Sequence, residues 1–297
     1  MALSSPILRL CRPANALTAA ADVVAGWCIA GADDWAALAL LAPASMLLYA
    51  GGITLNDVFD ARVDAVERPE RPIPSGAISR RAAAMLGAML LALGGALAVM
   101  ASLIIDTATW SGAIAGALIA LILLYDSILK KNALTRALGM GGCRGLNLAL
   151  GMSASGVALA VWWPLATIHF AYIGAVTLMS QTENAGQSAR SGPAIGILGA
   201  AAAVIAYLAA GFASVRVDGL LIAMFLAAFT LVTLPSMIQA ARTPQSKFVR
   251  GAVMAGVLGI VALDASIAAG FAGVVYGLGT LALLPLCMWL GARFAVT

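Results

Sequence analysis

Residues 36–64, AALALLAPASMLLYAGGITLNDVFDARVD, form an apolar run that ends in a group of carboxylates. No charged residue interrupts positions 36–56. A helix needs about 20 apolar residues to cross the hydrocarbon of a bilayer. This stretch therefore predicts a membrane-spanning helix with an acidic end.

The same apolar character extends over the whole chain, which has 297 residues, 62% of them hydrophobic and 10% charged. This composition excludes an ordinary soluble domain and predicts an all-α, polytopic transmembrane bundle. Charges and Gly, Pro or Ser clusters divide the chain into ten apolar runs: 13–31, 36–56, 80–104, 108–126, 134–155, 161–182, 192–213, 217–240, 248–270 and 272–292. We expect nine to ten spans, because the boundary between the last two runs is weakly marked.

We expect one integral membrane domain, residues 1–297, in a cell membrane. Alternating ten spans places almost all of the basic residues on one side, which the positive-inside rule assigns to the cytoplasm. Both termini would then be cytoplasmic, and two longer connections, about 57–79 and 183–191, would cap that side. The net charge of +4 is explained by this topology, so we expect lipid around the chain and no nucleic-acid partner.

The acidic end carries Asp57, Asp60 and Asp64, which are spaced by three and four residues. On a helix this spacing puts the three carboxylates on one face, where they repel one another unless a cation lies between them. The spacing is not that of a calcium-binding EF-hand loop. Mg²⁺ fits better, since it binds one or two carboxylates and completes its shell with water and substrate phosphates. The alternative is a solvated helix end without a ligand.

The motif NDVFDARVD at 56–64, followed by RPIPSG at 71–76, resembles the first signature of the UbiA family of intramembrane prenyltransferases. Two shorter features are similar to that family: the sequence RPAN at 12–15, and Tyr125 followed by Lys130, although this last spacing is one residue longer than usual. The resemblance implies a bundle around a central, lipid-accessible cavity. It also implies Mg²⁺ ions that hold a prenyl diphosphate while a hydrophobic acceptor attacks the prenyl group.

The resemblance assigns a role to each of several residues. Asp57, Asp60 and Asp64 would be the catalytic metal ligands, with Asn56 as a neighbouring oxygen donor. Basic side chains bind phosphate oxygens well, which makes Arg71 and Lys130 candidates for the diphosphate.

The second signature of the family departs from its usual pattern of two aspartates. Residues 180–188 read SQTENAGQS, in which only Glu183 is acidic and Gln187 stands four places later. Three explanations remain open: one Mg²⁺ suffices with Glu183 as a weaker ligand, the substrate is handled differently, or binding persists without chemistry. Arg190 is a further candidate for the diphosphate. This motif and the fifth span resemble the EboC-like branch, which implies a role in making or exporting a secondary metabolite.

Asp22, Arg144 and Asp264 lie inside expected spans, where an ionisable side chain costs several kcal/mol and normally has a partner. Asp22 and Arg144 lie at similar depth, so we predict that they meet. Two interpretations stay open: a structural pair between helices, or a site for the headgroup of the acceptor. Asn15, Tyr125 and Asn147 would line the same cavity, and for Asp264 we expect a local polar partner.

The leading hypothesis is therefore a membrane prenyltransferase that alkylates a small or lipid-soluble acceptor with a Mg²⁺-bound prenyl diphosphate. The main alternative is a non-catalytic lipid- or metabolite-binding protein, associated with export, on the same fold. A secondary transporter is a third hypothesis, although no inverted repeat is visible in the sequence.

Overall fold

The computed structural model describes residues 6–106, 108, 110–183, 191–214 and 217–294, and within these ranges every regular element is a helix. The α-helices are α1 (Pro6–Cys11), α2 (Pro13–Ile29), α3 (Trp35–Glu67), α4 (Arg80–Ile104), α5 (Ser111–Ser127), α6 (Ala133–Met152), α7 (Gly156–Trp162), α8 (Pro164–Ser180), α9 (Ser191–Ala213), α10 (Gly219–Arg242), α11 (Ser246–Ala272), α12 (Val274–Leu281) and α13 (Leu283–Phe294). A single 3-10 turn, η1 (Leu129–Lys131), joins α5 to α6. The expected all-α bundle is confirmed.

Six spans in the described part of the chain are long and apolar enough to cross a membrane, and a seventh is added if α7 and α8 form one bent span. The expected count of nine to ten is not confirmed. Three of the helices that fall short still coincide with expected runs. Of these, α2 and α5 have 17 residues each, and α6 is interrupted by polar side chains, including Arg144 and Asn147.

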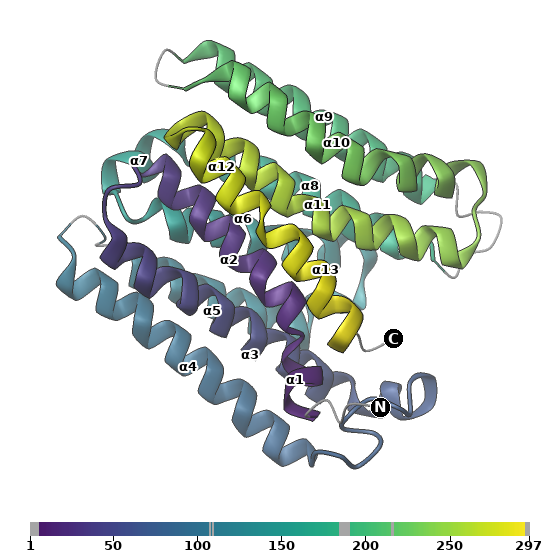
Figure 1. Ribbon diagram of the computed structural model, residues 1–297. Coiled ribbons are helices and arrows are strands. Elements are labelled where there is room, and N and C mark those ends of the chain that lie inside the picture. The colour runs from purple at the N-terminus through teal and green to yellow at the C-terminus, as the bar shows by residue number, and fades with distance from the viewer. Residues whose placement is uncertain (1–5, 107, 109, 184–190, 215–216, 295–297) are drawn as a thin grey trace.

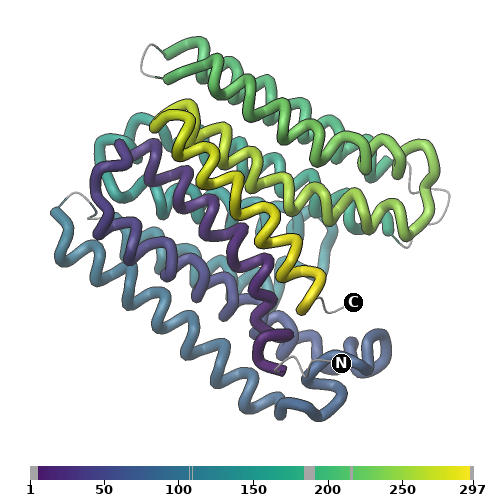
Figure 2. The backbone as a smooth tube through the Cα atoms, in the orientation of Figure 1, coloured from purple at the N-terminus to yellow at the C-terminus, as the bar shows by residue number. Residues whose placement is uncertain are grey.

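The helices pack side by side in layers (Figures 1 and 2). The α9–α10 pair, green in the figures, lies along α8 and α11, whereas α3, α4 and α5 lie on the opposite side. Between them, α11 packs against α2, and most of its residues from Gly259 to Gly270 are fully buried. The start of α1 and the end of α13 lie at the same end of the bundle as the end of α3.

Helix α3 corrects one expectation, because the first of the two expected connections, 57–79, begins as helix. The helix has 33 residues, which corresponds to about 50 Å at 1.5 Å per residue and exceeds a hydrocarbon layer of about 30 Å. It ends at Glu67, and Arg68 stands before Pro69, a position that disfavours helical backbone. The carboxylates therefore lie on a rigid helix. Most of the second connection, residues 184–190, lies outside the described residues.

Helices α2 and α6 approach each other unusually closely, through two glycines. A Cβ atom added to Gly26 would meet the backbone oxygen of Leu148, and one added to Gly151 would meet the backbone oxygen of Val23. Small residues of this kind let membrane helices pack backbone to backbone. The contact brings polar side chains of the two helices together within the bundle.

Candidate functional site

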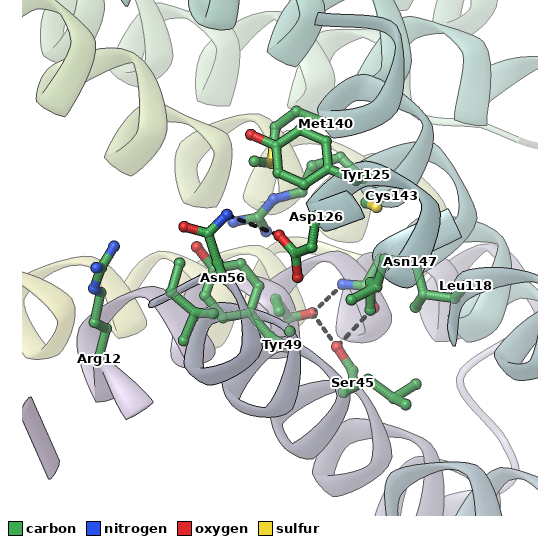
Figure 3. Close-up of a pocket in the computed structure, with 16 residues that line it drawn as sticks. Arg12, Ser45, Tyr49, Asn56, Leu118, Tyr125, Asp126, Met140, Cys143 and Asn147 are labelled. Atoms are coloured by element: carbon green, nitrogen blue, oxygen red, sulfur yellow. Dashed lines mark hydrogen bonds between the residues drawn. The ribbon is translucent and has the colours of Figure 1, made fainter. Parts of the chain in front are cut away.

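A cavity of about 250 Å³ lies between α2, α3, α5 and α6 (Figure 3). Its polar lining includes Arg12, Ser45, Tyr49, Asn56, Tyr125, Asp126, Arg144 and Asn147. The apolar lining comes from side chains such as Leu118, Ile122 and Met140. Charged side chains lie at two places on this cavity, and each place has its own network of contacts.

The first network is at the acidic end of α3, and we call it the mouth cluster. It consists of four carboxylates and three cations: Asp57, Asp60, Asp64, Asp126, Arg12, Arg71 and Lys130. Arg12 donates to Asp57 over 2.8 Å. Arg71 donates to Asp64 over 2.7 Å and to Asp57 over 3.4 Å. Asp57 and Asp64 are thus both neutralised by arginines, and both are buried.

Asp60 and Asp126 complete the mouth cluster from two different helices. The ammonium of Lys130 lies 2.7 Å from Asp60 Oδ1 and 4.0 Å from Asp126 Oδ1. The side-chain amide of Asn56 donates to Asp126 Oδ1 over 2.7 Å, as the dashed line in Figure 3 shows. Asp60, with a side chain 33% exposed, is the most accessible of the four carboxylates, since the other three side chains are 4% exposed or less.

The donor atoms of the mouth cluster fit a hard divalent cation. Four carboxylates face three basic side chains, which leaves one net negative charge among these seven groups. Asp57 Oδ2 and Asp126 Oδ2 are buried, and neither has a hydrogen-bond partner among the described residues. Orphaned buried oxygens are costly, and carboxylate and amide oxygens are the ligands that Mg²⁺ binds. The residues present therefore suit this ion.

The second network lies deeper in the bundle, and we call it the interior cluster: Asp22, Arg144, Asn147, His169 and Asp264. Arg144 donates to Asp22 Oδ2 over 2.9 Å, and Asn147 donates to the same oxygen, also over 2.9 Å. The predicted meeting of Asp22 and Arg144 is thus present. The guanidinium also lies over the ring of Tyr49, 5.3 Å from its centroid, so the cavity has a cationic floor.

The interior cluster continues behind this floor. His169 Nε2 lies 2.7 Å from Asp264 Oδ1, and His169 Nδ1 lies 2.6 Å from the hydroxyl of Tyr207. Asp264 therefore has the local polar partner that was expected. Ligand atoms of Asp22, His169 and Asp264 all lie within 4.8 Å of one another, a spacing that a metal ion could bridge. Arg144 already supplies one positive charge to this group.

The structure brings most of the predicted site residues together. Asn56, Tyr125, Arg144 and Asn147 line the cavity, and Asp22 lies directly behind Arg144.

Two predicted residues lie elsewhere, and a third is not described. Asn15 borders a separate groove between α2 and α13, so the expectation that it lines this cavity is wrong. Glu183 pairs with Arg250 at 2.8 Å, and Arg190 lies outside the described residues.

Two residues of the mouth cluster were missed by the sequence reasoning, Arg12 and Asp126. Arg12 lies between α1 and α2. Its φ of 44° is a left-handed backbone conformation, which is rare for residues other than glycine. Its basic charge was attributed to topology. Asp126 directly follows Tyr125, and an acid inside an otherwise apolar run was the signal that could have identified it.

Comparison with known proteins places this cavity in a family context. The UbiA prenyltransferase family matches residues 18–238 of this chain. A digeranylgeranylglyceryl phosphate synthase from Methanopyrus kandleri is 47% identical over 87 residues, 29% of this chain and 32% of that protein. The protein of the same name from Methanothermobacter thermautotrophicus is 32% identical over 148 residues, half of each chain. The matched segments thus span about a third to a half of these relatives.

Solved structures extend the likeness to nearly the whole chain. A UbiA homologue from Archaeoglobus fulgidus bound to GPP and Mg²⁺ covers 94% of this chain and all of its own, with a TM-score of 0.65 and 16% identity. The apo structure of a UbiA homologue from Aeropyrum pernix K1 covers 85% of this chain and 96% of its own, with a TM-score of 0.64 and 18% identity. At these identities the likeness establishes a shared fold.

Proposed function

This chain belongs to the UbiA prenyltransferase family, and from that premise we propose that it transfers a prenyl group from a prenyl diphosphate to a hydrophobic acceptor in the membrane. The observation that carries the proposal is the mouth cluster, in which acids and bases from three parts of the chain meet beside the cavity. A site that holds both signs of charge suits a cation and a polyanion bound together.

Asp57 and Asp60 are the proposed principal ligands of a divalent cation, with the carbonyl oxygen of Asn56 beside them. Asp64 is proposed to act mainly through Arg71, which it holds at 2.7 Å. Such a cation would withdraw charge from a diphosphate leaving group. Glu183 is proposed only as a weaker contributor, because its carboxylate pairs with Arg250.

Arg12, Arg71 and Lys130 are the proposed diphosphate-binding side chains. Each now pairs with a carboxylate of the mouth cluster. A cation bound to those carboxylates would free the basic groups for phosphate oxygens, which guanidinium groups bind in bidentate fashion.

The floor of the cavity is the proposed acceptor subsite. Arg144 and Asn147 present donors there, and Tyr49 and Tyr125 present rings. These groups favour an acceptor with a polar or anionic end. A volume of about 250 Å³ is at the small end for ligand pockets, so long isoprenoid or acyl tails would extend into lipid. The product would be a prenylated membrane lipid or secondary metabolite.

The proposed orientation puts the mouth cluster on the cytoplasmic side, because basic residues are concentrated in the connections at that end. Water-soluble Mg²⁺ and diphosphate would enter there. The acceptor would enter from the bilayer. This arrangement makes the chain a multi-pass membrane enzyme with both termini in the cytoplasm.

The test is Mg²⁺-dependent release of pyrophosphate from geranyl diphosphate (GPP) by the purified protein in lipid nanodiscs, with a lipid extract as acceptor. We expect release that disappears in Asp60→Asn and persists in Glu67→Gln, a matched loss of charge at the exposed end of the same helix. Saturable, Mg²⁺-dependent binding of GPP without release would instead favour a lipid- or metabolite-binding protein. Absence of both binding and release would refute the proposal.

A further inference from the structure

We propose that Asp126, on α5, is a further ligand of the divalent cation and replaces a carboxylate that the second signature lacks. This inference rests on the proposed function, since it concerns the same cation site. It adds a residue from a helix that carries neither of the two acidic signatures. The reasons are the position of Asp126, its unpartnered oxygen, and the charge balance of the cavity.

Asp126 lies at the end of α5, where the chain reaches the mouth of the cavity. Its side chain is 2% exposed and lines the cavity itself. Asn56 donates to its Oδ1 over 2.7 Å, which connects Asp126 directly to the first residue of the acidic signature on α3. A buried carboxylate at this place is costly unless it is paired with a cation.

The hydrogen bond from Asn56 fixes which oxygen of Asp126 is left free. Because the amide nitrogen of Asn56 is engaged by Asp126, its carbonyl oxygen is directed elsewhere, and Figure 3 shows it on the far side of the amide from Asp126. Asp126 Oδ2 is buried and has no hydrogen-bond partner in the described part of the chain. The atom that Asp126 offers to a cation is therefore its Oδ2.

Lys130 identifies where positive charge is stabilised. Its ammonium lies 2.7 Å from Asp60 and 4.0 Å from Asp126, so one cation already sits between carboxylates of α3 and α5. A divalent ion in this region would interact with the same two acids. Lys130 would then turn from the carboxylates to the diphosphate.

The charge balance explains why an acid is needed here. A diphosphate next to an uncompensated carboxylate would be repelled, so Asp126 is compatible with the proposed substrate only when a cation lies between them. The second signature has Glu183 and Gln187 where two aspartates are usual, and Glu183 is held by Arg250. Asp126 restores one negative charge to the metal site from another helix.

The experiment is a titration of the nanodisc-embedded protein with Mn²⁺ alone, followed by electron paramagnetic resonance of the free ion. Asp126→Asn preserves the size of the side chain and removes its charge. We expect it to weaken Mn²⁺ binding at least about tenfold, as Asp60→Asn should. Glu67→Gln should change binding less than about twofold. A thermal melt without metal checks that each variant is folded.

Lys130→Met, alone and combined with Asp126→Asn, separates a ligand role of Asp126 from a structural one. If the ammonium competes with the metal for Asp60 and Asp126, its removal should tighten Mn²⁺ binding several-fold and weaken GPP binding. If Asp126 is only structural, the tightening in Lys130→Met acts through Asp60 alone, and adding Asp126→Asn should leave it unchanged. If Asp126 is a ligand, the added substitution should weaken Mn²⁺ binding about tenfold.

The outcomes are distinguishable from failure of the proposed function. Wild-type affinity in Asp126→Asn, together with lost affinity in Asp60→Asn, would overturn the role of Asp126 and leave the prenyltransferase proposal standing. No saturable Mn²⁺ binding by the wild-type protein would overturn both. Weakened binding in both aspartate variants with tightened binding in Lys130→Met would support the ligand role.

Discussion

The mouth cluster and the interior cluster are both charged, but they differ in how far they are open to solvent. Both clusters hold more carboxylates than cations, and in each of them two carboxylate oxygens lack a hydrogen-bond partner among the described residues. The side chain of Asp60 in the mouth cluster is 33% exposed, however, whereas those of Asp22, Arg144, His169 and Asp264 are at most 6% exposed. In the interior cluster Arg144 is bound by Asp22 and by the hydroxyl of Thr18, and Asp22 also accepts from Asn147. The mouth is arranged to exchange partners, whereas most interior contacts are arranged to persist.

The two clusters also differ in what they connect. Asp57, Asp60 and Asp64 lie on one helix, and their partners reach them from the α1–α2 junction, the turn after α3 and the α5–α6 junction. The interior cluster joins α2 and α6, which pack against α3 and α5, to α8 and α11, which pack against α9 and α10. Substitutions in the mouth should therefore affect ligands first, and those in the interior should affect folding first.

The largest expected effect is on stability, at the ion pair between Asp22 and Arg144. Asp22→Asn leaves the buried guanidinium of Arg144 without its carboxylate, which should destabilise the protein by about 3–5 kcal/mol. The double variant Asp22→Asn/Arg144→Met should recover most of that loss, because it removes both charges. Thermal unfolding in a mild detergent measures both, with exposed Asp33→Asn as the control. An unchanged melting temperature combined with lost acceptor binding would identify the pair as a headgroup site instead.

The second largest expected effect is on activity, at Asp57 in the mouth cluster. Asp57→Asn removes a carboxylate that both Arg12 and Arg71 approach, and it should lower Mg²⁺-dependent pyrophosphate release from GPP by about 100-fold or more. The melting temperature should change little, since Arg71 keeps its pair with Asp64 and Arg12 is partly exposed. A variant that loses stability in proportion to activity would contradict the distinction between the two clusters.

A smaller effect tests how the interior cluster is positioned. Gly151→Ala places a Cβ against the backbone oxygen of Val23, so α2 and α6 must separate, at a cost of about 1–3 kcal/mol. Gly251→Ala is the matched control, because an added Cβ there meets nothing within 4 Å. The unfolding midpoint of Gly151→Ala should fall clearly further than that of Gly251→Ala. Equal shifts would show that the close approach of α2 and α6 is unimportant.

The smallest effect is expected at Glu183. Its ion pair with Arg250 is exposed on the arginine side, and such pairs contribute about 0–1 kcal/mol. Because Arg250 already engages its carboxylate, Glu183→Gln should cost activity no more than the pair is worth, which corresponds to a reduction of pyrophosphate release of about two- to fivefold. A loss as large as that of Asp57→Asn would assign Glu183 to the metal site and extend the mouth cluster to the second signature.

Much of the fold could be predicted because each apolar run has the length of a helix. The extension of α3 through Glu67 could not, since its polar residues resemble a loop when only hydropathy is considered. Similar depth predicted the contact of Asp22 with Arg144, because two opposite charges in an apolar medium must meet. The bond between His169 and Asp264 depends on how α8 packs against α11, which no local pattern specifies.

The candidate site was predictable where its residues form a motif and unpredictable where they arrive from elsewhere. Asp57 and Asp60 belong to one helical face and could be identified together. Arg12 reaches Asp57 across 45 positions, and Asn56 reaches Asp126 across 70. A basic residue near the N-terminus and a single acid after a tyrosine each have ordinary explanations in a membrane protein, so only the folded arrangement distinguishes them.

The long separation between Asp22 and Arg144 also has a consequence for biosynthesis. The two residues lie 122 positions apart, so at about 5–20 residues per second the ribosome needs roughly 6–24 s to deliver the arginine after the aspartate. During that interval α2 carries an unpaired carboxyl group, which costs a few kcal/mol at the centre of a bilayer. Arrival of α6 would therefore be the step that commits α2 to the membrane.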